Sequence, residues 1–152
     1  DGFGQALAQG AISMTLPDFA RAALFVLNKG RNYKGQQIVS TAFFDDLVAT
    51  NKKLKDAFKN YRSFAPNGHY RSQFWVIDAE KNQFMMIGIH GQLAYFDHNK
   101  EFALITFGAY PIAKDFLLVD SLVVLRDAIL RALVSNYRGD DEDFDLLLEV
   151  DK

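Results

Sequence analysis

The chain has 152 residues, of which 49% are hydrophobic and 14% aromatic, with 14 phenylalanines. This length and composition are typical of one globular domain with a sizeable core, and they exclude a disordered chain. The absence of cysteine excludes disulfides, thiolate metal ligands and a cysteine nucleophile. No apolar run reaches the roughly 18–20 residues that span a bilayer, so we expect no membrane span.

Charge and histidine content argue against metal, cofactor and nucleic-acid binding. The three histidines, at positions 69, 90 and 98, show no metal-ligand spacing, and we expect neither a metal nor a cofactor. The formal net charge is −2, and no basic stripe is interleaved with aromatic residues. We therefore predict that nucleic acid is not a partner.

Two segments have a local excess of one sign of charge. Residues 140–152 form an acidic tail that holds seven of the 19 acidic residues. Residues 51–62, NKKLKDAFKNYR, form the only basic cluster. This cluster is either a solvated face of a helix or loop, or a docking surface for an acidic partner such as the chain's own tail.

Helix signals dominate the first third of the chain. In the segment SMTLPDFARAALFVLNKG, Thr15 is a good N-cap, and Asp18 completes a pair that resembles a capping box. Pro17 falls in the first turn, where its missing N–H costs nothing, and Gly30 is expected to end the helix at the C′ position. A second, shorter helix is predicted in TAFFDDLVATN, with Thr41 as its cap.

Three extended stretches follow, at residues 70–78, 84–97 and 101–110. Turn signals at 79–82 and 98–100 separate them, so they predict a three-stranded antiparallel meander. The second and third strands are apolar at both alternating sets of positions, so we expect both of their faces to be covered.

A long helix is predicted at residues 114–139, where leucine and isoleucine recur every three or four residues. The order of helices, meander and final helix is typical of an α+β fold. A free three-stranded sheet of this composition would expose an edge that aggregates. We therefore expect a missing cover, which is either a partner chain or the rest of a longer chain.

Four segments together resemble a known family: GAISMTLPDFARAALFVLNKGRNYKGQQIVS, YRSQFWV, GIHGQLAYFD and EFALITF, followed by the long helix. They are similar to the C-terminal part of serine hydrolases of the β-lactamase and penicillin-recognising superfamily, in its class C, esterase and 6-aminohexanoate-dimer hydrolase branch. The resemblance covers roughly residues 10–135. It implies a partial β-lactamase/transpeptidase-like fold, with residues 1–139 as a C-terminal portion and 140–152 as an added tail.

The family's nucleophile motif is absent. Family members use Ser-x-x-Lys, a Tyr-x-Asn or Tyr-x-Ser motif, and a strand resembling Lys-Thr-Gly. No serine of this chain is followed three residues later by lysine. Tyr61-Arg-Ser63 and Tyr70-Arg-Ser72 match the sequence of the second motif. They follow the first predicted helix, whereas the family's motif precedes the corresponding helix, so we interpret both matches as coincidence. We predict that the chain alone is inactive.

The third motif has a counterpart in this chain. Met86-Ile87-Gly88 would occupy the Lys-Thr-Gly positions, and the resemblance makes the backbone N–H of Ile89 a donor to the oxyanion. Gly88 would let a substrate approach the strand. Because the motif departs from Lys-Thr-Gly, the resemblance favours an esterase-like or amidase-like branch over β-lactam recognition.

Neighbouring residues have two interpretations each. If the strand continues through position 92, alternation places Ile89 and Gly91 on one face and His90 and Gln92 on the other. His90 then either borders the substrate pocket with Gly91 and Gln92 or is a hydrogen-bonded structural histidine.

The aromatic pair Phe74 and Trp75 either forms a wall of the substrate cleft or packs in the core. Tyr95 and Asp97 are predicted to support a turn, and residues 98–100 to be the exposed turn itself.

The resemblance implies the C-terminal part of a serine hydrolase that cleaves a small-molecule amide or ester through an acyl-enzyme. This chain would supply the oxyanion strand and a pocket wall, and the missing N-terminal part or a partner chain would supply the nucleophile. One alternative is a non-catalytic binding or assembly module that retains this half-fold, which the acidic tail favours. Another is an unrelated α+β fold with a chance His-Gly-Gln sequence.

Overall fold

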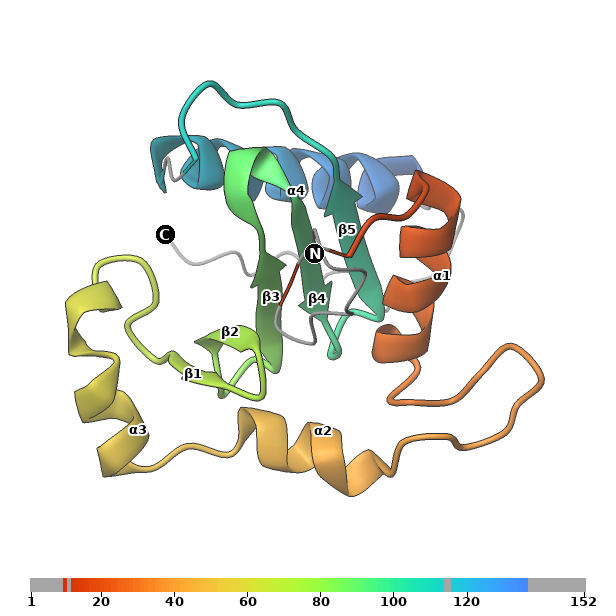
Figure 1. The fold of residues 1–152 in the computed structure, drawn as a ribbon, viewed down its shortest axis with the longest axis horizontal. Helices are drawn as coiled ribbons and strands as arrows, with labels where there is room; N and C mark the ends of the chain where they lie inside the picture. The colour runs from red at the N-terminus through yellow and green to blue at the C-terminus, as the bar shows by residue number, and fades with distance from the viewer. Residues whose placement is uncertain (1–9, 11, 114–115, 137–152) are drawn as a thin grey trace, which may run out of the picture. The chain divides into compact units, whose positions relative to one another are not determined.

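The computed structural model describes residues 10, 12–113 and 116–136 (Figure 1). The chain divides into two compact units, residues 1–113 and 114–152. The elements of the first unit are α1 (Leu16–Leu27), α2 (Thr41–Val48), α3 (Lys52–Ala57), η1 (Lys59–Tyr61), β1 (His69–Arg71), β2 (Phe74–Asp78), β3 (Gln83–Ile87), η2 (Ile89–Gly91), β4 (Leu93–Asp97) and β5 (Phe102–Thr106). The second unit contains α4 (Phe116–Asn136). The fold class is α+β, as predicted.

The sheet has five antiparallel strands in the order β1-β2-β3-β4-β5, so the prediction of three strands is wrong. The stretches 70–78 and 84–97 each fold back as two strands. In the first, Ser72 and Gln73 have φ angles of 50° and 68° and form the two-residue turn between β1 and β2. Neither is a glycine or asparagine, which explains why the sequence does not reveal the turn.

The core lies between one face of the sheet and the helices of the first unit. Helix α1 contacts β4 and β5, α2 contacts β2, and α3 contacts β1 (Figure 1). Strand β4 is buried at every position, whereas β5 is half-buried along its length. The expectation of covered faces is therefore confirmed for β4 but not for β5. The buried side chains of this cluster are Ala23, Phe44, Leu47, Phe74, Val76, Phe84, Ala94 and Phe96.

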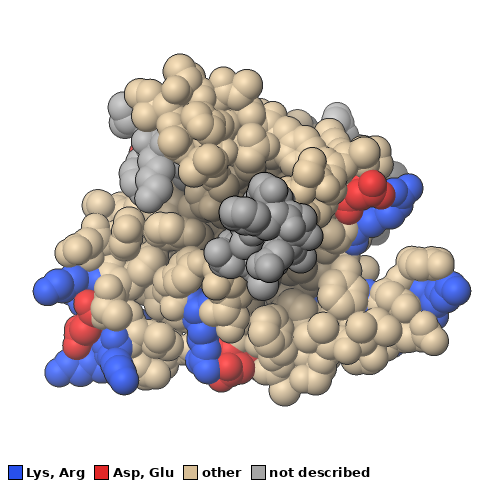
Figure 2. All heavy atoms as spheres, viewed as in Figure 1, with Lys and Arg blue, Asp and Glu red and all other residues tan. Residues whose placement is uncertain are grey.

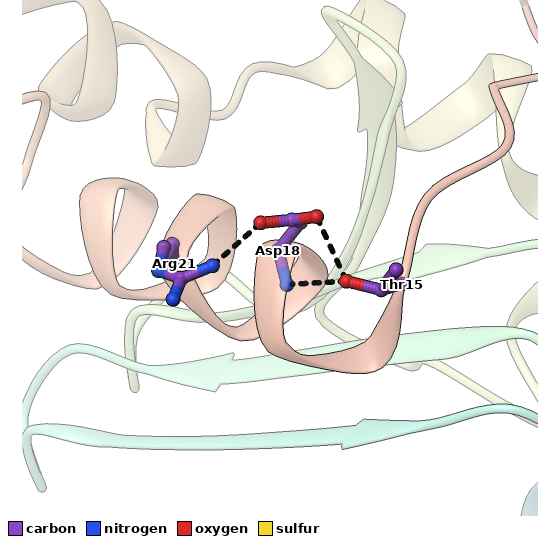
Figure 3. A network of polar contacts seen from close by, with 3 residues as sticks. All are labelled: Thr15, Asp18 and Arg21. Carbon is purple, nitrogen blue, oxygen red and sulfur yellow. Dashed lines mark hydrogen bonds and ion pairs between the residues drawn. The ribbon is translucent and has the colours of Figure 1, made fainter.

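The start of α1 follows the prediction closely. The Thr15 hydroxyl accepts a hydrogen bond from the Asp18 N–H (3.3 Å) and donates one to the Asp18 carboxylate (2.8 Å). Arg21 donates to the other carboxylate oxygen at 2.5 Å (Figure 3). The hydrogen bond from Thr15 and then the one from Arg21 lower the pKa of Asp18, because both favour its ionised form.

Two predicted helix boundaries are wrong by one residue. The C-cap of α1 is Asn28, so Lys29 occupies the C′ position and Gly30 follows it. The backbone is left-handed at both, with φ angles of 49° and 78°. Helix α2 begins at Thr41, and Ser40 occupies the N-cap position.

Two histidines join the sheet to the last turns of α1 and α2. The Nε2–H of His69 donates to the Leu47 carbonyl at 3.0 Å, and that of His98 donates to the Val26 carbonyl at 3.2 Å. These carbonyls belong to the group that a helix leaves without an intrahelical partner. Residues 98–100 form the predicted turn and Asn99 and Lys100 are exposed, but His98 is half-buried, so its predicted exposure is wrong. Burial lowers the pKa of both imidazoles.

The basic cluster lies on α3 and η1. Figure 2 shows lysine and arginine side chains gathered over α3, at the lower left of the view. Lys52, Lys53 and Lys59 are exposed, and Arg62 lies 3.7 Å from Asp56. These exposures agree with the solvated-face interpretation.

Helix α4 falls within the predicted range 114–139. The ends of that range and the acidic tail at 140–152 lie outside the described residues. Among the helices described, none is long and apolar enough to span a membrane.

Candidate functional site

The segment Gly88–Gln92 connects β3 to β4 as a tight turn, so the prediction of a strand through position 92 is wrong. Ile89–Gly91 form a short turn whose helical conformation is interrupted at His90. The backbone is left-handed at His90 (φ 58°) and Gly91 (φ 87°). The alternation of side chains expected for a strand therefore does not apply to Ile89, His90, Gly91 and Gln92.

Backbone hydrogen bonds hold this turn at Gly88, His90 and Gln92. The Gly88 N–H donates to the Gln92 carbonyl at 2.8 Å, and the Gln92 N–H donates to the Ile89 carbonyl at 3.4 Å. The His90 N–H donates to the Ala113 carbonyl at 3.1 Å. Among the described residues, the Ile89 N–H has no acceptor. Ile89 as a residue is 57% exposed, and it lies just beyond the end of β3.

The residues after β5 hold this turn from outside. The Gln92 side-chain amide donates to the Gly108 carbonyl at 2.7 Å, and the Thr106 hydroxyl donates to the Gly91 carbonyl at 3.3 Å. An added Cβ at Gly108 would lie 2.8 Å from the His90 carbonyl oxygen. The backbone of the 106–110 segment therefore passes directly against the turn, and a side chain at position 108 would separate them.

Two glycines of the turn are also confined by their neighbours. An added Cβ at Gly88 would lie 2.9 Å from the Cβ of Gln92. An added Cβ at Gly91 would lie 2.7 Å from the ring of Tyr110. Packing alone therefore accounts for glycine at both positions. Gly108 and Tyr110 are not among the residues predicted for the site. The one sequence signal is Gly108 itself, because an isolated glycine within a strand pattern indicates a bulge or a close approach of the backbone.

The aromatic pair predicted for the pocket wall divides between the two faces of β2. Phe74 lies in the core, with its ring 5.3 Å from that of Phe84. Trp75 is half-buried and lies edge-on to Tyr61 at 5.0 Å and to Tyr70 at 5.5 Å. Phe74 therefore takes the core role, and Trp75 belongs to a surface aromatic cluster at the sheet edge formed by β1.

The register places Trp75 at a distance from the turn. Trp75 pairs with Met85, which precedes Gly88 by three residues, or about 10 Å along a strand. The structure therefore brings Gly88, Ile89, His90, Gly91 and Gln92 together in one turn and does not bring Phe74 or Trp75 against it.

The carboxylate of Asp97 supports the turn between β4 and β5, as predicted. Its Oδ1 accepts a hydrogen bond from the Lys100 N–H at 3.0 Å. Its Oδ2 accepts from the Gln83 amide at 2.9 Å and from the Tyr95 hydroxyl at 3.5 Å. Asp97 is 1% exposed, so these bonds satisfy a buried carboxylate.

The described part of the chain offers no set of ligands for a metal ion. Within it, no group of three or more histidine, aspartate or glutamate side chains is placed to hold one. What the site offers chemically is a backbone N–H donor, one half-buried imidazole and a glycine-lined surface. A free backbone donor of this kind can bind a carbonyl oxygen and stabilise the negative charge that develops on it.

The chain is distantly similar to a curated hydrolase. No protein-family model matches the chain. The chain is 28% identical over 110 residues to a 6-aminohexanoate-dimer hydrolase from Paenarthrobacter ureafaciens. The match covers 72% of this chain and 27% of the hydrolase, so the chain spans about a quarter of the length of that curated relative. Most of the chain is therefore distantly similar to part of this hydrolase.

Proposed function

We propose that this chain supplies the oxyanion strand and part of the pocket wall of a β-lactamase-like serine hydrolase. The substrate is a small-molecule amide or ester, cleaved through an acyl-enzyme. The observation that carries the proposal is the Ile89 N–H, which has no acceptor among the described residues and lies two residues beyond the end of β3. The distant hydrolase match includes most of the chain and agrees with this assignment.

The proposed chemistry is acyl transfer. A serine hydroxyl attacks the substrate carbonyl, the carbonyl oxygen becomes an oxyanion, and the Ile89 N–H donates a hydrogen bond to it. A backbone donor works with any side chain, so isoleucine is compatible with the role. In this proposal the backbone of His90, together with Gly91 and Gln92, borders the pocket, and Trp75 forms its more distant aromatic wall.

The nucleophile and its base come from elsewhere in this proposal, because the chain has no Ser-x-x-Lys sequence. They belong to other residues of the full protein or to a partner chain. The sheet offers a place to join such a segment, because β5 has no second neighbour among the described strands. An unpaired edge of this kind accepts a further strand.

The first test is the full reading frame, followed by removal of the Ile89 N–H. A Ser-x-x-Lys sequence in the same protein or in a co-purified partner is the expected result. In that active protein, replacing the Gly88–Ile89 amide with an ester removes the donor and keeps the side chain. We expect kcat to fall about 10²–10³-fold with little change in KM.

A matched control is the same ester replacement at Ile12, an exposed isoleucine, where we expect no change in kcat. An unchanged kcat after the Ile89 replacement contradicts the oxyanion role. Serine-dependent turnover by the 152-residue chain alone contradicts the assignment of the nucleophile to other residues. A natural protein without any Ser-x-x-Lys, alone or in complex, favours the non-catalytic module instead.

A further inference from the structure

His90 has an unfavourable backbone conformation for its residue type. Its φ of 58° lies in the left-handed region, which costs a residue with a side chain about 1–2 kcal/mol relative to the right-handed one. Such a conformation persists only where surrounding contacts hold it. The identity of these contacts therefore indicates what the turn is built to fix.

Three atoms of His90 are tied to the segment after β5. The Tyr110 N–H donates to the His90 carbonyl at 3.1 Å, and the His90 imidazole Nδ1–H donates to the Tyr110 carbonyl at 2.7 Å. The His90 N–H donates to the Ala113 carbonyl at 3.1 Å. The first two bonds form a closed pair between His90 and Tyr110, and only the imidazole bond depends on the side chain.

These contacts fix the peptide group that follows Ile89. The bond from the His90 N–H holds the Ile89–His90 peptide plane, and the bond from the Gly88 N–H holds the Ile87–Gly88 peptide, so the Gly88–Ile89 peptide that carries the donor lies between two bonded peptides. Peptide groups are planar and rotate as units. The Ile89 N–H, between these bonded groups, has no acceptor among the described residues and is available to a ligand.

We propose that His90 is a positioning residue, whose imidazole bond to Tyr110 holds the turn so that the Ile89 N–H stays directed at a substrate carbonyl oxygen. This inference rests on the proposed oxyanion role of Ile89. The imidazole then acts by positioning the Ile89 N–H and does not itself contact the substrate.

The test replaces His90 with glycine and with asparagine in the active full protein. His90→Gly keeps the left-handed backbone without strain and removes the imidazole bond. His90→Asn keeps both a tolerance for the left-handed region and a shorter side-chain donor. We expect kcat to fall about tenfold or more in His90→Gly, with KM nearly unchanged, and less in His90→Asn, because one hydrogen bond of about 1–1.5 kcal/mol orders the donor.

The matched control is Glu101→Gly. Glu101 is also a left-handed residue with a side chain, at φ 48° in the turn after β4, and it is exposed. We expect this substitution to leave kcat unchanged. Thermal unfolding of the three variants separates a general loss of stability from a loss of catalysis.

Amide hydrogen exchange of the same proteins reports on the turn without any substrate. We expect the His90 and Tyr110 amides to exchange about tenfold faster in His90→Gly, while amides of β3 and β4 keep their protection. Unchanged exchange at these two amides overturns the inference. Faster exchange with unchanged kcat also overturns it.

The two proposals fail in different ways. If the Ile89 ester lowers kcat and His90→Gly does not, the oxyanion role stands and the positioning role of His90 is wrong. If neither change affects kcat, the proposed function itself is wrong, and the inference falls with it.

Discussion

The two ends of the β3–β4 pair are held by different kinds of contact. At one end, which we call the carboxylate end, Asp78 and Asp97 close the turns at 78–82 and 97–101. Their side chains accept hydrogen bonds from backbone N–H groups only two or three residues further on. At the other end, the glycine end, the turn at 88–92 is held by residues 106–113, whose bonding partners in the turn lie 15–23 residues earlier in the chain.

This difference separates local from cooperative structure. A turn that is closed by an aspartate side chain depends only on residues next to it in the sequence, so it can form in a short peptide. The glycine end forms only after β4 and β5 have paired, because its partners come from the far side of that hairpin. The free Ile89 N–H belongs to the cooperative end, so its direction depends on the completed sheet.

The largest effect that we predict tests the close approach at the glycine end. In Gly108→Ala, the new Cβ would lie 2.8–2.9 Å from the backbone of His90 and Gly91. Backbone atoms cannot relieve the overlap by changing rotamer, as a side chain can. We therefore expect the free energy of unfolding to fall by about 3 kcal/mol. Denaturant unfolding of the purified chain measures it.

Gly35→Ala is the matched control. Gly35 has a left-handed φ of 79°, but an added Cβ there meets nothing within 4 Å. We expect a loss of only about 1 kcal/mol, which comes from backbone conformation alone. Equal losses for the two substitutions would show that the glycine end is not tightly packed.

The difference between local and long-range contacts also decides which features can be predicted from the sequence. The Thr15–Asp18 cap and the Asp97 turn are contacts over two or three residues, and the sequence predicts both. The two-residue turn at Ser72 and Gln73 is stabilised by the pairing of β1 with β2, because neither residue is a glycine or asparagine that would favour its left-handed backbone. It was therefore predicted as continuous strand.

The candidate site is only half predictable for the same reason. A family resemblance singles out Gly88 and Ile89 from the sequence. The left-handed turn at His90 and its bonds to Tyr110 depend on a segment 20 residues away, and no local pattern encodes that pairing. Alternation along an assumed strand consequently gave the wrong arrangement for Ile89–Gln92.

A second prediction concerns His69 and His98, whose contacts are also long-range. Their partners lie 22 and 72 residues away, at the ends of α2 and α1. Burial lowers the pKa of both imidazoles in the folded chain, whereas in the unfolded chain they titrate near 6.5. The unfolded state therefore binds more protons as the pH falls below about 7, and stability must decrease.

We expect the free energy of unfolding to be greatest above pH 7 and to fall steadily between pH 7 and pH 5.5. His69 contributes because its Nδ1 is buried without a partner among the described residues, so a proton there would have no acceptor. A double variant, His69→Gln and His98→Gln, keeps an N–H donor near each helix carbonyl and removes the titration. Its stability should change much less over this range, and an unaltered slope would contradict the assignment.

The smallest effects belong to the local network at the start of α1 (Figure 3). Thr15→Ala removes the N-cap, and we expect it to cost about 1 kcal/mol. Arg21→Gln removes the ion pair with Asp18. Its effect should be smaller, because the Arg21 and Asp18 side chains are 73% and 56% exposed and salt screens them. Unfolding at low salt and in 1 M NaCl distinguishes the two, since only the Arg21 effect should disappear.

Double substitutions test whether the glycine end is one cooperative unit. The Thr15 cap shares no partner with the turn at 88–92, so Thr15→Ala and Gly108→Ala should be additive within about 0.5 kcal/mol. Gly108→Ala and His90→Gly act on the same contact, so their joint cost should be smaller than the sum of the two. If the second pair is also additive, the His90 bond and the Gly108 approach stabilise the fold independently, and the glycine end is not one cooperative unit.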